Sequence, residues 1–210
     1  MIEITNTDVY GWEAAIRGMR NPMNSWNKTD TVFGLGEDYY SDMVIGDNDL
    51  SLMTKLIKGG TEHRKFLRMI NVTLDINAPL YWWKEFDTYK VGTVANSCST
   101  MHKIHSKEFT REDFSIEHLT EDASREMNVI ISLLNDYRIK FIFHKDKFYW
   151  WQMIQLLPSS YNQKRTVQLN YEVLMTMYRQ RKGHKLDEWR TFCKWVEGLP
   201  YMKEFLEVTE

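Results

Sequence analysis

A stretch of small polar residues near the middle of the chain has chemistry that suits ligand binding. It carries hydroxyl, amide and thiol groups at Thr93, Asn96, Cys98, Ser99 and Thr100. Hydroxyls and backbone N–H groups can bind a phosphate group without a formal positive charge. The same composition is ordinary in turns, so a purely structural role is the alternative. In either case, residues 91–100 are expected to form a loop.

Arg181 could hold a planar ligand, because its guanidinium presents donors in a fixed fork that can meet two acceptors at once. The structural alternative is a surface arginine at the end of a helix, where the helix dipole favours a cation. The neighbouring cations Arg179 and Lys182 make this alternative credible. The sequence leaves both roles open.

Four further side chains could contact a cofactor. The ring of Tyr89 could stack on a flat ligand, and Lys90 could meet a phosphate as a point charge. The Asn170 amide can donate to and accept from a ring edge, although Asn also often caps the helix that follows it. His63 is the fourth candidate, and an exposed capping position is its structural alternative.

Neither a disulfide framework nor a metal site is expected. Cys98 and Cys193 are the only cysteines, and no neighbouring histidine or cation gives a reason to expect an activated thiol at Cys98. His102 and His105, with acidic residues nearby, match no strong ligand spacing.

The elements that position these residues follow from local patterns. Ile2 to Ile4 could begin a strand, after which the polar cluster Thr5–Asp8 is expected to cap a helix that ends at Asn21. Residues 24–46 are expected to form a surface loop, and residues 48–58 a helix that stops at Gly59. The run 71–77 alternates apolar and polar residues, as a half-buried strand does.

The rest of the chain is mostly helical. Trp82 and Trp83 lie in an apolar helix, and we expect them, with the aromatic run 149–151, to fill cores rather than bind bases. Residues 160–168 are polar and extended. Further helices are expected at residues 120–137, 148–156, 171–181 and 186–196, with a short tail helix. Residues 1–210 therefore indicate one mainly helical α+β domain with a small sheet.

Composition excludes several classes of protein. Net charge is −2, so no general basic field exists to hold nucleic acid. The N-terminus lacks the pattern of a signal peptide, and no run is apolar for long enough to cross a bilayer. We expect a cytoplasmic protein without membrane or nucleic-acid partners.

Two blocks of the chain resemble the flavin-dependent thymidylate synthases. The first begins at His63 and continues through a strand to Pro79, an aromatic helix and the hydroxyl-rich segment that ends near Thr100. The second has Leu157-Pro158, Asn170, Leu174 and Arg181 at the separations found in that family. The family's Arg-His-Arg triplet falls on Thr88-Tyr89-Lys90, and residues 24–46 and 103–145 match nothing in it.

The resemblance implies an α+β fold with a small antiparallel sheet and a homotetramer whose active sites lie between subunits. It implies transfer of a one-carbon unit from methylenetetrahydrofolate to a pyrimidine nucleotide such as dUMP through FAD, which NADPH reduces. Arg181 would then be catalytic and would hold the pyrimidine. His63, Tyr89, Lys90 and Asn170 would contact FAD, and Thr93, Asn96, Cys98, Ser99 and Thr100 would bind the nucleotide.

Replacement of the Arg-His-Arg triplet leaves two other hypotheses open. Each lost arginine removes a charge-assisted contact of about 1.5–3 kcal/mol. The chain could therefore be a nucleotide-binding homologue without flavin chemistry, or a scaffold that binds a partner through its unmatched segments. Cations from those segments, such as Lys103, Lys107 and Arg111, could compensate for the loss.

Overall fold

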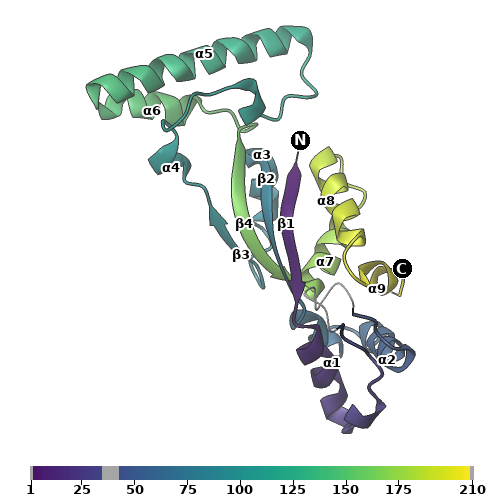
Figure 1. Cartoon of the computed structure of the whole chain (residues 1–210). Helices are drawn as coiled ribbons and strands as arrows, with labels where there is room; N and C mark the ends of the chain where they lie inside the picture. The colour runs from purple at the N-terminus through teal and green to yellow at the C-terminus, as the bar shows by residue number, and fades with distance from the viewer. Residues whose placement is uncertain (1, 35–42, 209–210) are drawn as a thin grey trace. The chain divides into compact units, whose positions relative to one another are not determined.

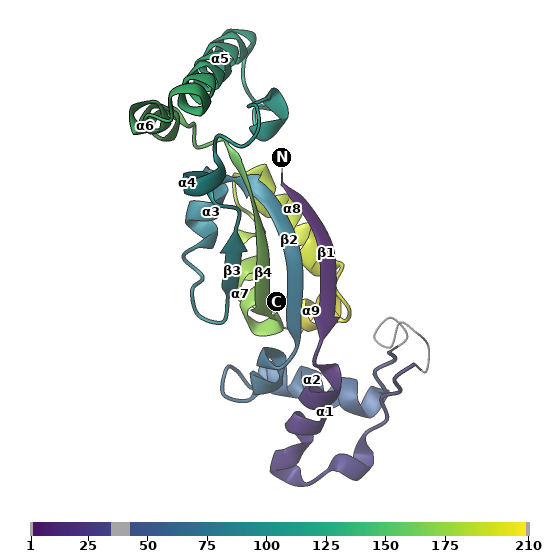
Figure 2. The ribbon, with the colours of Figure 1, turned by 60° about the vertical axis from the view of Figure 1, so that its left-hand side comes forward.

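The computed structural model describes residues 2–34 and 43–208 (Figure 1). Its strands are β1 (Glu3–Tyr10), β2 (Asn71–Pro79), β3 (Val94–Ser97) and β4 (Asn162–Asn170), which form one antiparallel sheet in the order β1-β2-β4-β3 (Figure 2). The helices are α1 (Trp12–Arg20), α2 (Asp47–Lys58), α3 (Leu80–Phe86), α4 (Thr100–Lys103), α5 (Glu121–His144), α6 (Lys147–Leu156), α7 (Tyr171–Arg181), α8 (Asp187–Glu197) and α9 (Met202–Glu207). The predicted mainly helical α+β class is confirmed.

Elements with a clear hydrophobic period are found where the sequence predicts them. Strand β2 buries Val72, Leu74 and Ile76 on one face, and α2, α6, α7 and α8 lie within two residues of their expected bounds. The polar stretch expected to be extended forms β4. Local periodicity was therefore sufficient to predict these elements.

The expected start of the first helix is wrong. Residues Thr5–Asp8 do not cap a helix but continue β1 as far as Tyr10, and α1 begins only at Trp12. Most β1 side chains are exposed, and the strand is at the edge of the sheet, where its backbone pairs on one side only. Gly11 makes the turn with φ of 96°, and a Cβ there would lie 2.1 Å from the Met69 carbonyl oxygen.

Two further expectations need correction. The segment expected as a loop at residues 91–100 contains β3, a short strand at the edge of the sheet. All four of its residues are exposed, so its sequence does not show the alternation of apolar and polar residues that marks a half-buried strand. Helix α5 extends past the expected end to His144 and stops only at Lys145, which has φ of 56°. The described part of the loop expected at residues 24–46 contains a short 3-10 turn, Trp26–Lys28, and an antiparallel bridge between Val32 and Val44, while residues 35–42 lie outside the described part.

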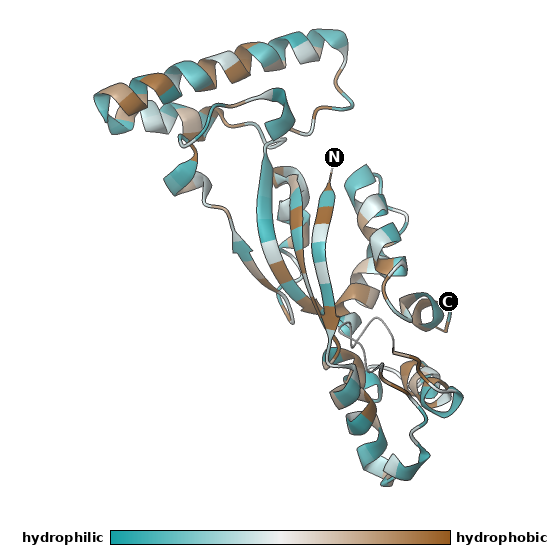
Figure 3. Cartoon of the chain, in the orientation of Figure 1, coloured by the Kyte–Doolittle hydropathy of each residue, from teal (hydrophilic) through white to brown (hydrophobic). Residues whose placement is uncertain are grey.

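The chain divides into two units. The first comprises residues 1–5, 75–88 and 95–166. In it α5 and α6 lie side by side, and polar and apolar residues alternate along α5 (Figure 3). Trp82 and Trp83 are fully buried, as expected, whereas Trp151 is 43% exposed and contradicts the expectation of a core position. The core beneath α5 and α6 is formed by Ile104, Phe109, Phe114, Met127, Ile131, Leu134 and Met153.

The second unit comprises residues 6–74, 89–94 and 167–210. Its core is aromatic: the ring centroid of Trp12 lies 5.2 Å from that of Tyr171 and 6.3 Å from that of Phe205. The buried Tyr171 hydroxyl donates to the Pro200 carbonyl at 2.9 Å. Burial raises the pKa of Tyr171 well above its usual value, so the phenol remains a hydrogen-bond donor.

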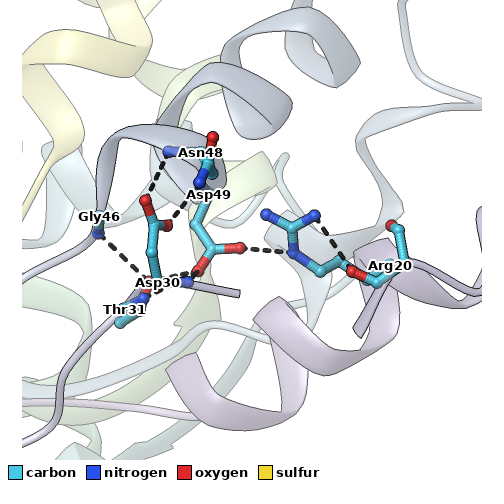
Figure 4. A network of polar contacts seen from close by, with 7 residues as sticks. Arg20, Asp30, Thr31, Gly46, Asn48 and Asp49 are labelled. Carbon is cyan, nitrogen blue, oxygen red and sulfur yellow. Dashed lines mark hydrogen bonds and ion pairs between the residues drawn. The ribbon is translucent and has the colours of Figure 1, made fainter. Parts of the chain in front are cut away.

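A buried polar network joins α1 to the start of α2 in the second unit (Figure 4). Arg20 donates from Nε to Asp49 Oδ1 at 2.7 Å, and both side chains are almost fully buried. The other Asp49 oxygen accepts hydrogen bonds from the backbone of Asp30 and Thr31 and from the Thr31 hydroxyl. Asp30 accepts in turn from the backbone N–H groups of Asn48 and Asp49, which lowers the Asp30 pKa. These bonds fix the segment before α2 against α1.

Candidate functional site

A cavity of about 330 Å³ lies within the first unit, and we call it the β3–α4 cavity. Three of the five residues that the sequence singles out for nucleotide binding line it together: Cys98, Ser99 and Thr100. They lie between the end of β3 and the start of α4. The other lining residues are Asn77, Lys103, Ile104, Ser106, Lys107, Phe109, Glu112, Asp113, Tyr161, Asn162, Gln163 and Lys164.

Charged side chains around this cavity include three lysines. Lys107 forms an ion pair with Asp113, and Lys164 Nζ lies 3.0 Å from Asp75 Oδ2. The third is Lys103, the last residue of α4. Lys103 and Lys107, two of the cations that could compensate for the lost arginines, line the same cavity as Cys98, Ser99 and Thr100. The third such cation, Arg111, instead donates to Asn128 and Ser124 on α5.

Gln163 fixes the wall that carries Cys98. It is 8% exposed and donates from Nε2 to the Cys98 carbonyl at 2.8 Å, while its Oε1 accepts from Arg165. The Cys98 N–H donates to the Lys164 carbonyl at 2.9 Å. Sequence reasoning missed Gln163. The signal available was the position of Gln163 in β4: it precedes the buried Val167 and Leu169 by four and six residues and therefore lies on the same face of the strand. A polar side chain buried on that face requires a hydrogen-bond partner.

Two further ionisable groups, Tyr161 and Glu112, line the cavity. Burial, and then the nearby Asp113 and Cys98, raise the pKa of Tyr161, so its phenol keeps its proton. A hydrogen bond with the Thr110 side chain lowers the pKa of Glu112, so this carboxylate stays ionised. The cavity therefore offers a neutral donor and acceptor at Tyr161 and a fixed negative charge at Glu112.

The remaining two predicted substrate residues do not line this cavity. Asn96 is exposed on β3. Thr93 belongs to the second unit, and its Oγ1 is buried without a hydrogen-bond partner among the described residues. Of the five small residues predicted to bind the nucleotide, three therefore line one cavity and the other two lie elsewhere.

Arg181 and Tyr89 lie together in the second unit. Arg181 donates from Nε to the Tyr89 hydroxyl at 2.9 Å, and that hydroxyl donates to Gln180 Oε1 at 2.8 Å. The Arg181 guanidinium lies over Trp189, 4.8 Å from the ring centroid. Lys90, the next residue after Tyr89, is exposed. Arg181, the last residue of α7, is therefore held by defined contacts, which fit both the binding role and its structural alternative.

Asn170 is at the opposite end of α7. It caps the helix by accepting from the Val173 N–H at 3.1 Å, as its structural alternative predicts. Eleven residues separate it from Arg181, which corresponds to about 16 Å along a helix. Gly92 packs against this end, since a Cβ there would lie 3.1 Å from Asn170 Nδ2. Loop residues 89–94 thus contact α7 near both of its ends.

His63 lines a different cavity, of about 540 Å³, between α1, α2 and the 3-10 turn Arg64–Arg68. Its side chain is exposed and makes no capping hydrogen bond. The cavity wall is largely apolar and includes Met19, Met23, Phe66 and Met69, with polar groups at its rim. These side chains suit one face of a flat ring, because thioethers pack well on aromatic systems.

Within one chain, the cavity that contains His63 provides only part of the contacts predicted for a flavin. Of the four residues singled out for cofactor contact, His63 is the one found in this cavity, and Tyr89, Lys90 and Asn170 are not among the described residues that line it. The β3–α4 cavity is near the lower end of the size range of ligand pockets and suits a mononucleotide better than a dinucleotide such as FAD.

At positions 2–34 and 43–208 no group of three or more His, Cys, Asp or Glu side chains could hold a metal ion. Within the same ranges, every helix is too short or too polar to cross a bilayer.

Comparison with solved structures shows which fold this is. Thymidylate synthase X (ThyX) from Helicobacter pylori, crystallised with FAD and dUMP, superposes with a TM-score of 0.69 over 98% of this chain and 97% of that chain, at 15% sequence identity. The UMP/dUMP methylase PolB from Streptomyces cacaoi, bound with 5-Br dUMP, gives a TM-score of 0.61 over 100% and 92%, at 12% identity. The chain therefore has the ThyX fold. No protein-family model and no curated protein sequence matches it.

Proposed function

We propose that the protein binds a pyrimidine mononucleotide in the β3–α4 cavity and methylates its base. The observation that carries the proposal is the grouping of Cys98, Ser99 and Thr100 in one cavity with three lysines. The likeness in fold to a flavin-dependent thymidylate synthase and to a dUMP methylase supports the choice of ligand and reaction.

The side chains of the cavity supply the contacts that a nucleotide needs. Hydroxyls at Ser99 and Thr100 can bind phosphate or sugar oxygens. The protonated Tyr161 phenol can donate to a carbonyl or hydroxyl. Gln163 acts as a positioning residue, because it holds the Cys98 carbonyl and so fixes the wall that carries these groups.

The reaction that we propose transfers a one-carbon unit from methylenetetrahydrofolate to the pyrimidine. Bound FAD, reduced by NADPH, would supply the electrons and relay the carbon. His63 and the methionines of its cavity would contact the flavin ring, while Tyr89, Lys90 and Asn170 would have to reach it from another copy of the chain. The proposal therefore includes self-association, and a homotetramer is the form that the resemblance implies.

Arg181 and Thr93, which belong to the second unit, are proposed to reach the pyrimidine nucleotide from another copy of the chain, where Arg181 would hold and polarise the base; Asn96 would assist nucleotide binding. Both units are built from non-contiguous segments, and this supports treating residues 1–210 as one domain. The same proposal places the protein in the cytoplasm, where reduced nicotinamide and folate cofactors are available.

One observation favours a second candidate, a nucleotide-binding homologue without flavin chemistry. The Arg181 Nε and one face of its guanidinium are already occupied by Tyr89 and Trp189. Binding of a pyrimidine through the Arg181 Nε must therefore displace Tyr89.

The test combines three measurements on purified protein. Calorimetric titration with dUMP measures nucleotide binding, and the visible spectrum after incubation with FAD and desalting measures flavin retention. Release of tritium from C5-labelled dUMP in the presence of methylenetetrahydrofolate and NADPH measures turnover. Positive results in all three support the enzyme, and nucleotide binding without flavin or turnover supports the second candidate. A well-folded protein that does not bind dUMP excludes both.

A further inference from the structure

We infer that Lys103 is the residue that recognises the phosphate group of the ligand in the β3–α4 cavity. The inference rests on the proposed nucleotide site and goes further, because it assigns the phosphate to one side chain and defines the substrate class as a phosphate monoester. The argument starts from the charges that surround the cavity.

Two of the three cavity lysines already have carboxylate partners. Lys107 is paired with Asp113, and Lys164 with Asp75. In the described part of the chain, Lys103 forms no ion pair, and its side chain is exposed. A phosphate that approaches Lys103 therefore gains a charge-assisted contact without displacing a protein carboxylate.

The backbone sets Lys103 beside the hydroxyls of the same cavity. Its N–H donates to the Ser99 carbonyl at 3.1 Å, so the two residues are one helical turn apart and on the same side of α4. The Ser99 hydroxyl also accepts from the His102 N–H at 3.1 Å, which holds this turn closed. One ammonium and two hydroxyls, from Ser99 and Thr100, are thus presented to the cavity together.

Glu112 decides how the ligand must lie. This carboxylate lines the cavity, the Thr110 side chain lowers its pKa, and its negative charge would repel a phosphate placed next to it. The phosphate therefore belongs at the α4 side, and the sugar or base belongs toward Glu112 and Tyr161. A cavity of about 330 Å³ accommodates a mononucleotide in this orientation.

The experiment compares two ligands that differ only in the phosphate. Calorimetric titrations with dUMP and deoxyuridine are made on the full chain and on Lys103→Gln. The exposed Lys84→Gln, on α3 and outside the cavity, is the matched control. Lys103→Gln should weaken dUMP binding by about tenfold or more and leave deoxyuridine binding within about twofold. Lys84→Gln should change neither, and both variants should keep the denaturation midpoint of the wild type.

A second variant tests the orientation. Glu112→Gln removes the repelling charge and should tighten dUMP binding several-fold without improving deoxyuridine binding. Equal losses for dUMP and deoxyuridine in Lys103→Gln, or a loss no greater than in Lys84→Gln, would overturn the inference.

Inorganic phosphate, followed by phosphorus NMR, separates this inference from the proposed function. If the wild type binds phosphate through Lys103 but does not bind dUMP, the phosphate site stands and the nucleotide proposal fails. If dUMP binds with unchanged affinity to Lys103→Gln, the nucleotide proposal stands and the role of Lys103 is rejected. Absence of both phosphate and dUMP binding rejects the two together.

Discussion

The Nε of Arg181 lies 2.9 Å from the hydroxyl oxygen of Tyr89, although 92 residues separate the two in the chain. The guanidinium also lies 4.8 Å from the ring centroid of Trp189. An arginine whose conformation is already restricted by such contacts loses less conformational entropy when a ligand binds to it. This geometry suits a binding arginine and equally suits a structural one, so kinetics must separate the two roles.

We predict that Arg181→Ala lowers kcat/KM for dUMP by two or more orders of magnitude, of the size seen when one electrostatic donor is removed. Arg181→Lys should rescue little of this loss, because an ammonium lacks the guanidinium fork. Tyr89→Phe keeps the ring but removes the acceptor, and should change kcat/KM by about tenfold at most. Tritium release measures all three. If Arg181→Ala lowers only the denaturation midpoint and leaves kcat/KM intact, the side chain is structural.

The buried pair of Arg20 and Asp49 should dominate the stability of the second unit. Asp49→Asn leaves the buried guanidinium without its counter-charge and should cost about 3–5 kcal/mol of unfolding free energy. Denaturant unfolding followed by circular dichroism measures the effect. As a control, Asp122→Asn breaks an exposed ion pair with Arg125 and should give little measurable change. Similar midpoints for the two variants would contradict the importance assigned to the buried network.

His105 should make stability sensitive to pH. Burial first, and then Lys145, Lys103 and Arg138, lower its pKa from the ordinary 6.5. Its ring packs on Phe141, with centroids 4.8 Å apart. The unfolded chain therefore binds a proton more readily than the folded protein, so this group lowers stability as pH falls below about 6.5 and has no such effect above it.

The variant His105→Gln removes this titration. Its denaturation midpoint should fall less than that of the wild type between pH 7.5 and pH 5.5. Equal falls in the two proteins would show that His105 is protonated as easily in the folded state as in the unfolded state.

The two cysteines should differ sharply in reactivity. Burial, and then Glu197, raise the pKa of Cys193 to about 11, whereas Cys98 is exposed and lines the β3–α4 cavity. A disulfide reagent at pH 8 should therefore modify one thiol rapidly, and Cys98→Ser should abolish that phase. Saturating dUMP should slow the reaction. Modification that is indifferent to dUMP would count against a nucleotide in this cavity.

The elements with a regular spacing of apolar residues could be predicted from the amino-acid sequence alone. In strand β2 and in helices α2, α7 and α8, the spacing of apolar residues indicates which face is buried. This spacing is a local property, because side chains return to the same face at a fixed interval along a helix or a strand. The cap at Asn170 is local in the same way. The resemblance to a known family also identified the fold correctly, since the α+β class and the likeness to the ThyX structure are both found.

The edge strands and the grouping of the candidate residues could not be predicted from local patterns and are seen in the folded structure. Strands β1 and β3 are polar, and pairing with a neighbour, rather than an apolar face, makes them strands. Lys103 and Gln163 line one cavity with Cys98, Arg181 contacts Tyr89 in the other unit, and His63 lines a different cavity. Distances between residues that are remote in the chain depend on how elements pack, and packing sums many weak contacts that no short stretch of sequence contains.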